Sequence, residues 1–183
     1  AAANARLYQL AQANPLFAGM GCTIVLALVI DNLYWIGHIG DSRAYLIAPD
    51  RAQQLTEDHT WVSARVKEGL LTLEQAARHP RRHVLDQALG AAETVSLTLQ
   101  RAAQVRPAHH LVLCSDGVHE VLAAETLQRI INENDAETAA QALIKQAVQA
   151  GSHDNVSAVV LRWDAALVTD PLEFIDTHPE GIR

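Results

Sequence analysis

The sequence predicts an α+β fold in which helices pack on antiparallel sheets. Apolar segments of strand length follow one another closely in the first third of the chain, joined by connections too short for crossover helices. Helical patterns are grouped later, and a last apolar segment follows them. The chain has 183 residues, of which 49% are hydrophobic and 19% charged, so it has the composition and length of one globular domain.

Residue type and turn signals predict four elements in the first third of the chain. A segment rich in Ala, Leu and Gln favours a helix, and an Asn-Pro dipeptide ends it. A continuous β-branched run predicts a strand buried on both faces, and the Asp-Asn dipeptide that follows is typical of a hairpin turn. In chain order, these elements are a helix over residues 2–13 and strands over residues 22–30, 33–39 and 43–48.

Capped helices and short strands make up the remainder. Thr72 and Gln75 match a capping box, and a segment ending before Gly151 has the clearest helical periodicity of the chain. The predicted helices are 60–68, 72–78 and 136–150, and the predicted strands are 95–99, 111–114 and 156–163. Residues 164–183 have no periodicity, so we expect a domain over residues 1–163 followed by a C-terminal tail.

Charge and cysteine content exclude several classes of protein. With 14 basic and 21 acidic residues the formal net charge is −7, which disfavours binding to nucleic acid or to an anionic membrane. The longest apolar run is too short to cross a bilayer, and the first residues lack the pattern of a secretory signal. Cys22 and Cys114 lie in apolar runs and are expected to be buried thiols. We therefore expect a cytoplasmic monomer.

Three aspartates stand beside the ends of predicted strands: Asp41, Asp116 and Asp154. Carboxylates held at the ends of strands suit hard divalent cations such as Mg²⁺ and Mn²⁺. The alternative is that each aspartate only forms a turn, since Asp-Gly and Asp-Asn are common turn dipeptides. The spacing along the chain does not decide whether the three meet in space.

Five ordered motifs extend this hypothesis to nearly the whole chain. They are Gly19-Met20-Gly21-Cys22-Thr23, Gly40-Asp41-Ser42-Arg43-Ala44-Tyr45, Leu55-Thr56-Glu57-Asp58-His59, Leu113-Cys114-Ser115-Asp116-Gly117-Val118 and Asp154-Asn155-Val156-Ser157. In this order the chain resembles the metal-dependent serine/threonine protein phosphatases of the PP2C type, in their bacterial form. The resemblance implies a central antiparallel β-sandwich flanked by helices.

The resemblance also implies a site and a reaction. Asp116 and Asp154 match ligands of the first catalytic metal, and Asp41 matches an aspartate that shares a weaker third metal with Asp116. Residues 60–80 match the flap beside the substrate groove. The implied reaction is hydrolysis of phosphoserine and phosphothreonine in substrates of a Ser/Thr kinase, by a water that Mn²⁺ or Mg²⁺ activates.

Two N-terminal motifs of this family, Arg-x-x-Asn-x-Asp and Asp-Gly-Met-Gly-Gly, are absent from the 183 residues. In the family they supply the phosphate-binding arginine and the aspartate that bridges two metals. We therefore expect the N-terminal strands of the fold to be missing, either because the sequence starts late or because the protein is a shortened relative. The 183 residues alone are expected to be inactive. The alternative function is a non-catalytic phosphatase-like domain that binds a partner or senses a signal.

Other motifs favour simpler interpretations. Residues 40–44 resemble the nucleophile elbow of serine hydrolases but lack its last glycine. His79 and His83 have the spacing of zinc ligands, but Pro80 breaks the helix that would align them. Asp58 and His59 are expected to form a local corner that starts the next helix. Arg81 and Arg82 are expected to be a solvated pair.

Overall fold

The computed structural model describes residues 1–30, 32–100, 103–104 and 106–163, and its strands form two four-stranded antiparallel sheets. In the first sheet β2 lies between β1 and β5, and β6 also pairs with β2; the order in the second is β4-β3-β7-β8. The first sheet comprises β1 (Ile24–Ile30), β2 (Leu33–Ile39), β5 (Thr98–Leu99) and β6 (Ala103–Gln104). The second comprises β3 (Arg43–Ile47), β4 (Ala52–Gln54), β7 (His110–Cys114) and β8 (Ala158–Arg162).

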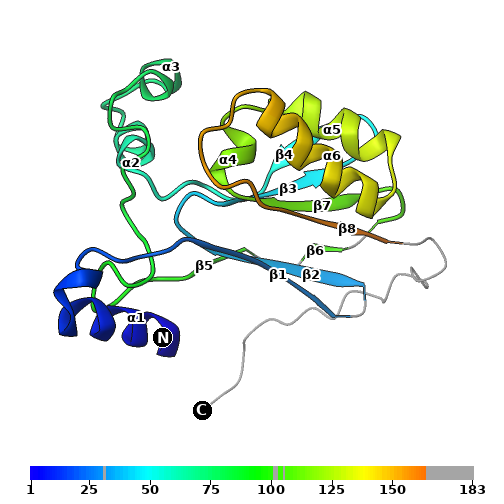
Figure 1. Cartoon of the computed structure of the whole chain (residues 1–183). Helices are drawn as coiled ribbons and strands as arrows, with labels where there is room; N and C mark the ends of the chain where they lie inside the picture. The colour runs from blue at the N-terminus through cyan, green and yellow to red at the C-terminus, as the bar shows by residue number, and fades with distance from the viewer. Residues whose placement is uncertain (31, 101–102, 105, 164–183) are drawn as a thin grey trace, which may run out of the picture.

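The two sheets pack face to face around an apolar layer (Figure 1). β1 and β2 form the predicted hairpin, with Ile24 opposite Ile39 and Ile30 opposite Leu33. Alternate residues of its strands turn inward, as the period of two requires. The buried centre of this layer consists of Tyr34, Ile36, Ala44 and Leu111. The β-sandwich expected from the resemblance is therefore confirmed.

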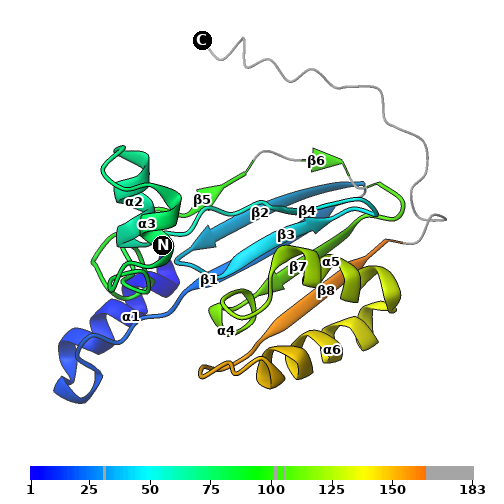
Figure 2. The ribbon, with the colours of Figure 1, turned by 90° about the horizontal axis from the view of Figure 1, so that it is seen from above.

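A second apolar core lies on the outer face of the second sheet, beneath a layer of helices (Figures 1 and 2). These helices are α4 (Asp116–His119), α5 (Ala124–Glu133) and α6 (Ala136–Gln149). The sequence prediction included α6 but missed α5. Leu127, Ile130 and Ile131 of α5 are buried and have the i, i+3, i+4 spacing of a helix that covers a sheet.

The other helices gather beyond one end of the sheets, as Figure 2 shows. They are α1 (Ala2–Ala13), the 3₁₀ turn η1 (Pro15–Phe17), α2 (Trp61–Lys67) and α3 (Leu73–Ala77). The capping box of Thr72 and Gln75 is formed, as predicted. Asn4 of α1 is buried and binds the 90–93 segment with three hydrogen bonds, to Gly90 N, Ala92 O and Glu93 O. The longest of the described helices, α6, has 14 residues, and none of them has the length and hydropathy needed to span a bilayer.

Three sequence predictions are wrong in detail. The strand β1 is not buried on both faces: the side chains of Leu28 and Ile30 are 52% and 50% exposed. Among the described residues, β1 pairs only with β2, and the helices α4 to α6 cover the other sheet (Figure 1). Cys22 is exposed, whereas Cys114 is buried as expected. The strand predicted over 95–99 has only two residues, in β5, and the predicted tail lies outside the described residues.

Candidate metal centre

Strand register brings the three predicted aspartates to one end of the second sheet, beside the start of β3, the end of β7 and the start of β8. We call this end the carboxylate edge. Cys114, the last residue of β7, pairs with the first residue of β3 on one side and the first residue of β8 on the other. Asp41 lies two residues before β3, Asp116 two residues after β7, and Asp154 four residues before β8. The three aspartates come from segments far apart in sequence, and the antiparallel order of the strands places these segments at the same end of the sheet.

The turns that carry Asp116 and Asp154 are joined by hydrogen bonds. Ser115 Oγ donates to Asn155 O over 3.1 Å and accepts from Ser157 N over 3.1 Å. The Ser115 amide also donates to Ser157 O over 3.1 Å. These bonds continue the β7–β8 pairing beyond the strands. They fix the turn of Asp116 relative to the turn of Asp154.

Asp41 and Asp116 lie close enough for their charges to interact. Burial, followed by the negative charge of Asp116, raises the pKa of Asp41 to about 6. A cation held between such carboxylates removes their repulsion, and carboxylate oxygens are the ligands that Mg²⁺ and Mn²⁺ prefer. The donor set therefore fits a hard divalent ion.

Two of the three carboxylates, those of Asp116 and Asp154, also form the hydrogen bond that the turn interpretation predicts. Asp116 Oδ1 accepts from Gly117 N over 2.8 Å, and Asp154 Oδ1 accepts from Asn155 N over 2.6 Å. In both, the second oxygen accepts no hydrogen bond from the described residues. Outside positions 31, 101–102, 105 and 164–183, no three His, Cys, Asp or Glu side chains come close enough to bind one ion by themselves. A cation at this end of the sheet would therefore need water or substrate oxygens to complete its coordination.

An ion pair beside this edge corrects the prediction for Asp58. Its carboxylate does not form a local corner but binds Arg43 of β3 through two bonds, Nε–Oδ1 of 2.8 Å and Nη2–Oδ2 of 2.6 Å. Arg43 Nη1 also donates to the Tyr45 hydroxyl over 3.0 Å. This two-pronged geometry holds the start of β3 against the 55–59 segment.

Two histidines that sequence reasoning did not place at the site contact the Asp41 turn. His119, at the end of α4, donates from Nε2 to the Asp41 carbonyl over 3.0 Å. Burial, with the nearby Arg43, lowers the pKa of His119 to about 4, so the ring is neutral. His59 accepts a hydrogen bond at Nδ1 from Gly40 N over 3.2 Å. No sequence pattern pairs His119 with a residue 78 positions away.

A cavity of about 360 Å³ lies between the carboxylate edge and helices α2 and α3. Asp41 and His119 line it on one side, and Ala76 and Arg82 line it on the other. His83 Nδ1 lies 2.6 Å from Glu120 Oε1 and links the segment after α3 to the end of α4. The cavity therefore opens beside Asp41, between the sandwich and the 60–83 segment, whereas neither Asp116 nor Asp154 lines it.

Comparison with known proteins decides the family. The family model described as Protein phosphatase 2C matches residues 2–65. The serine/threonine protein phosphatase PstP of Mycobacterium tuberculosis is 34% identical over 159 residues, which are 87% of this chain and 30% of PstP. Protein phosphatase PhpP of Streptococcus pneumoniae is 30% identical, over 86% of this chain and 64% of PhpP. The structure of the S. agalactiae serine/threonine phosphatase matches with a TM-score of 0.83 and 30% identity, over 88% of this chain and 67% of that one.

The chain belongs to the PP2C family of bacterial serine/threonine phosphatases. It spans about a third of PstP and under two thirds of PhpP. A solved structure of the PstP catalytic domain holds two manganese ions; it matches with a TM-score of 0.74 and 32% identity, over 86% of this chain and 65% of that one.

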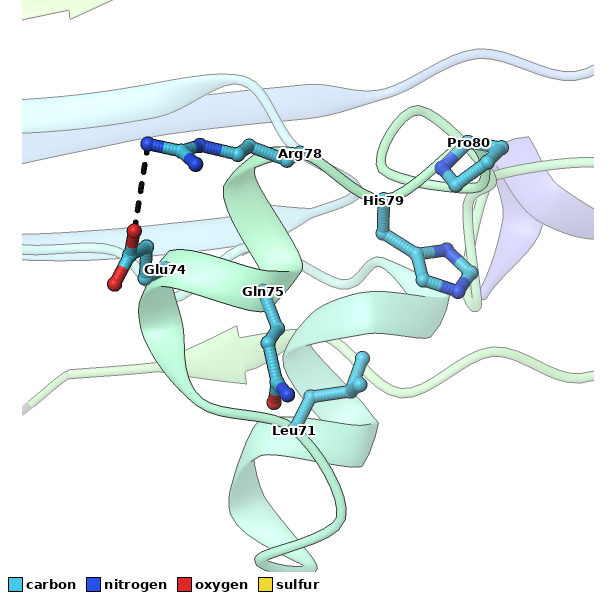
Figure 3. A pocket seen from close by; sticks show the side chains of 6 residues that line it. All are labelled: Leu71, Glu74, Gln75, Arg78, His79 and Pro80. Carbon is cyan, nitrogen blue, oxygen red and sulfur yellow. Dashed lines mark ion pairs between the residues drawn. The ribbon is translucent and has the colours of Figure 1, made fainter.

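The larger hollow of this PP2C chain lies away from the carboxylate edge. It has a volume of about 550 Å³ and lies along α3. Leu71, Gln75 and Pro80 line it (Figure 3). Glu74 and Arg78, which form an ion pair of 3.3 Å, also line it. None of the three predicted metal ligands lines this hollow. The smaller cavity is therefore the candidate site.

The two histidines considered as zinc ligands have separate partners. His79 stacks on Trp61 with ring centroids 4.9 Å apart, whereas His83 binds Glu120. Arg81 is not simply solvated, because its guanidinium lies over the Trp61 ring at 5.2 Å. Arg82 is exposed, as predicted, but also lines the cavity beside Asp41. In this PP2C chain, the segment from Thr60 to His83 thus contributes Arg82 to the wall of the cavity, while Trp61, His79 and Arg81 pack against one another.

Proposed function

We propose that this PP2C chain acts as a metal-dependent protein phosphatase on phosphoserine and phosphothreonine. The observation that carries the proposal is that the segments of Asp41, Asp116 and Asp154 lie at the same end of the second sheet, where Asp41 lines a cavity of about 360 Å³. The names of the relatives support the reaction class, since PstP is a serine/threonine protein phosphatase. The manganese in the PstP structure supports Mn²⁺ as the cofactor, with Mg²⁺ as the alternative.

The aspartates have distinct roles in this proposal. Asp116 and Asp154 would hold one cation together, and the Ser115 hydrogen bonds fix their turns relative to each other. Asp41 would share a second, weaker cation with Asp116, whose charge acts on it. A bound Mn²⁺ or Mg²⁺ supplies Lewis-acid chemistry that lowers the pKa of a coordinated water and neutralises phosphoryl oxygens.

The protein's own groups orient this site and receive the substrate. The Gly117 amide, by its bond to Asp116 Oδ1, fixes which oxygen of that carboxylate stays free. The cavity between the sheet edge and α3 receives the phosphorylated side chain, and Arg82 on its wall supplies a positive charge for the phosphate. The proposed substrates are phosphoproteins made by a Ser/Thr kinase, met in the cytoplasm by a monomeric domain formed by residues 1–163.

We further propose that the 183 residues hold one half of a two-metal site. Neither the Arg-x-x-Asn-x-Asp motif nor the Asp-Gly-Met-Gly-Gly motif occurs in the sequence. Loss of the ligand that bridges two metals removes most of the rate of two-metal hydrolysis. The alternative function is a non-catalytic phosphatase-like domain that binds a partner or senses a signal.

The experiment compares two proteins on a phosphothreonine peptide with millimolar Mn²⁺. One is the 183-residue chain, and the other is this chain extended at its N-terminus by a segment that carries both motifs. We expect turnover only from the extended protein, and its loss in the Asp116→Asn and Asp154→Asn variants. Asp135→Asn, on the exposed start of α6, is the control and should keep full activity.

Each other outcome has a defined meaning. Turnover by the 183-residue chain would overturn the half-site proposal. An extended protein that binds Mn²⁺ without hydrolysing the peptide would favour the non-catalytic alternative.

A further inference from the structure

The turn that carries Asp41 has an unusual backbone and a close neighbour. Gly40 has φ of +99°, and a Cβ at this position would lie 2.3 Å from Thr23 Cγ2. The hydroxyls of Thr23 and Ser42 are hydrogen-bonded over 2.8 Å. The turn is therefore pressed against the segment before β1, and its conformation depends on glycine at position 40.

His59 binds Gly40 through two hydrogen bonds. The His59 amide donates to Gly40 O over 3.0 Å, and Gly40 N donates to His59 Nδ1 over 3.2 Å. Because Nδ1 accepts, the ring proton lies on Nε2, which then donates to Thr98 Oγ1 over 3.0 Å. One imidazole thus connects the Asp41 turn to β5.

A second histidine fixes the plane of that imidazole. His38 of β2 stacks on His59 with ring centroids 4.6 Å apart and an interplanar angle of 26°. His38 is itself buried, and its Nε2 donates to Glu57 O over 2.7 Å. The His59 ring is therefore held by contacts from β2, from β5 and from Gly40.

His119 of α4 binds the same turn through a different atom, the Asp41 carbonyl oxygen. It lies three residues after Asp116, and its Nε2 donates to the Asp41 carbonyl over 3.0 Å. This bond joins the backbone of Asp41 to the short helix that begins at Asp116. The distance between the two aspartates is therefore set through His119 as well as through the β3–β7 pairing.

We propose that His59 and His119 are positioning residues that hold the Asp41 turn against Asp116, so that both carboxylates face one cation. The physical reason is that two carboxylates at one edge repel each other before a cation binds. A turn held only by its own backbone would move Asp41 away from Asp116. The hydrogen bonds of His59 to Gly40 and of His119 to the Asp41 carbonyl oppose this movement. The inference rests on the proposed function of Asp41 as a metal ligand.

The test measures Mn²⁺ binding to the 183-residue chain, with the free Mn²⁺ quantified by electron paramagnetic resonance. We expect His59→Ala and His119→Ala to weaken binding at the Asp41 site by about 10-fold, as loss of a group that orients a ligand does. His59→Asn places an amide oxygen where Nδ1 accepts, and His119→Gln places an amide nitrogen where Nε2 donates. Both should restore binding to within about threefold of the parent. His109→Ala, at the opposite end of β7, is the control and should not change binding.

A second measurement needs no metal. Hydrogen exchange at the Gly40 amide, measured by NMR, should be faster in His59→Ala than in the parent and slow again in His59→Asn. Thermal unfolding of each variant shows whether it is folded at the temperature used. If His59→Ala is unfolded, the His119 variants and His59→Asn still test the proposal.

Asp41→Asn separates this inference from the proposed function. If it binds Mn²⁺ as the parent does, Asp41 is not a ligand, and the proposed role of Asp41 fails. If it weakens binding but the histidine-to-alanine variants do not, only the positioning role fails. Alanine variants that lose affinity without rescue by Asn or Gln would also overturn it, because the loss would then be structural.

Discussion

The backbone of Gly117 packs directly against the carbonyl oxygen of Asn155. A Cβ at position 117 would lie 2.5 Å from that oxygen, closer than any side chain tolerates. The contact brings the residue after Asp116 against the residue after Asp154. Close approach, rather than backbone conformation, is the reason for glycine here, because Gly117 has an ordinary negative φ.

We expect Gly117→Ala to lower the free energy of unfolding by about 2 kcal/mol, because the added methyl group must push the two turns apart. The same displacement should weaken Mn²⁺ binding. Urea denaturation and a Mn²⁺ titration check the two effects. Gly69→Ala is the matched control, since it has a positive φ but nothing within 4 Å of its Cβ. It should cost some stability through backbone strain and leave Mn²⁺ binding unchanged.

The raised pKa of Asp41 predicts a pH dependence of stability in the metal-free protein. Its carboxyl has a pKa of about 6 when folded and about 3.8 in the unfolded reference, so the folded state binds more protons between these values. The free energy of unfolding should therefore fall as pH rises from about 4 to 6. The carboxyl is partly exposed, and solvent screening limits the effect to about 1 kcal/mol. Asp41→Asn should lose this part of the pH dependence in urea denaturation series without metal. An identical fall in parent and variant would contradict the prediction.

The ion pair of Arg43 and Asp58 should contribute more to stability than the surface ion pairs. Its side chains are 25% and 14% exposed and share two hydrogen bonds. We expect Asp58→Asn to cost about 2 kcal/mol, because it leaves the Arg43 guanidinium without its charged partner. Glu57→Gln removes one partner of the exposed Lys67–Glu57 pair and should cost less than about 0.5 kcal/mol. Equal costs for the two variants in chemical denaturation would show that burial of the first pair has no effect.

Metal should stabilise the folded chain through the carboxylate edge. A ligand that binds only the folded state at 100 times its Kd adds about 2.7 kcal/mol to the free energy of unfolding. We expect Mn²⁺ to raise Tm, and EDTA to reverse the rise. Asp154→Asn should abolish most of the shift, whereas Asp135→Asn should keep it. A shift that survives in Asp154→Asn would place the bound metal elsewhere.

Short-range signals in the sequence predicted several elements correctly. The Asn-Pro end of α1, the hairpin of β1 and β2 and the Thr72 capping box each depend on interactions within a few residues. Such interactions form wherever the local sequence allows them. Helix α5 had a usable signal, the spacing of Leu127, Ile130 and Ile131, but no cap marked its start.

The candidate site, like the fold, could be predicted from the sequence only in part. Residue patterns alone indicated which residue types stand at the strand ends and pointed to Asp41, Asp116 and Asp154. The folded structure was needed to show that these positions lie at one end of the second sheet, because that depends on the order and register of β3, β7 and β8. It also decided that Asp58 binds Arg43 and that His119 binds the Asp41 turn. These contacts join residues 15 and 78 positions apart, and no local preference encodes a pairing that forms only when the sheet assembles.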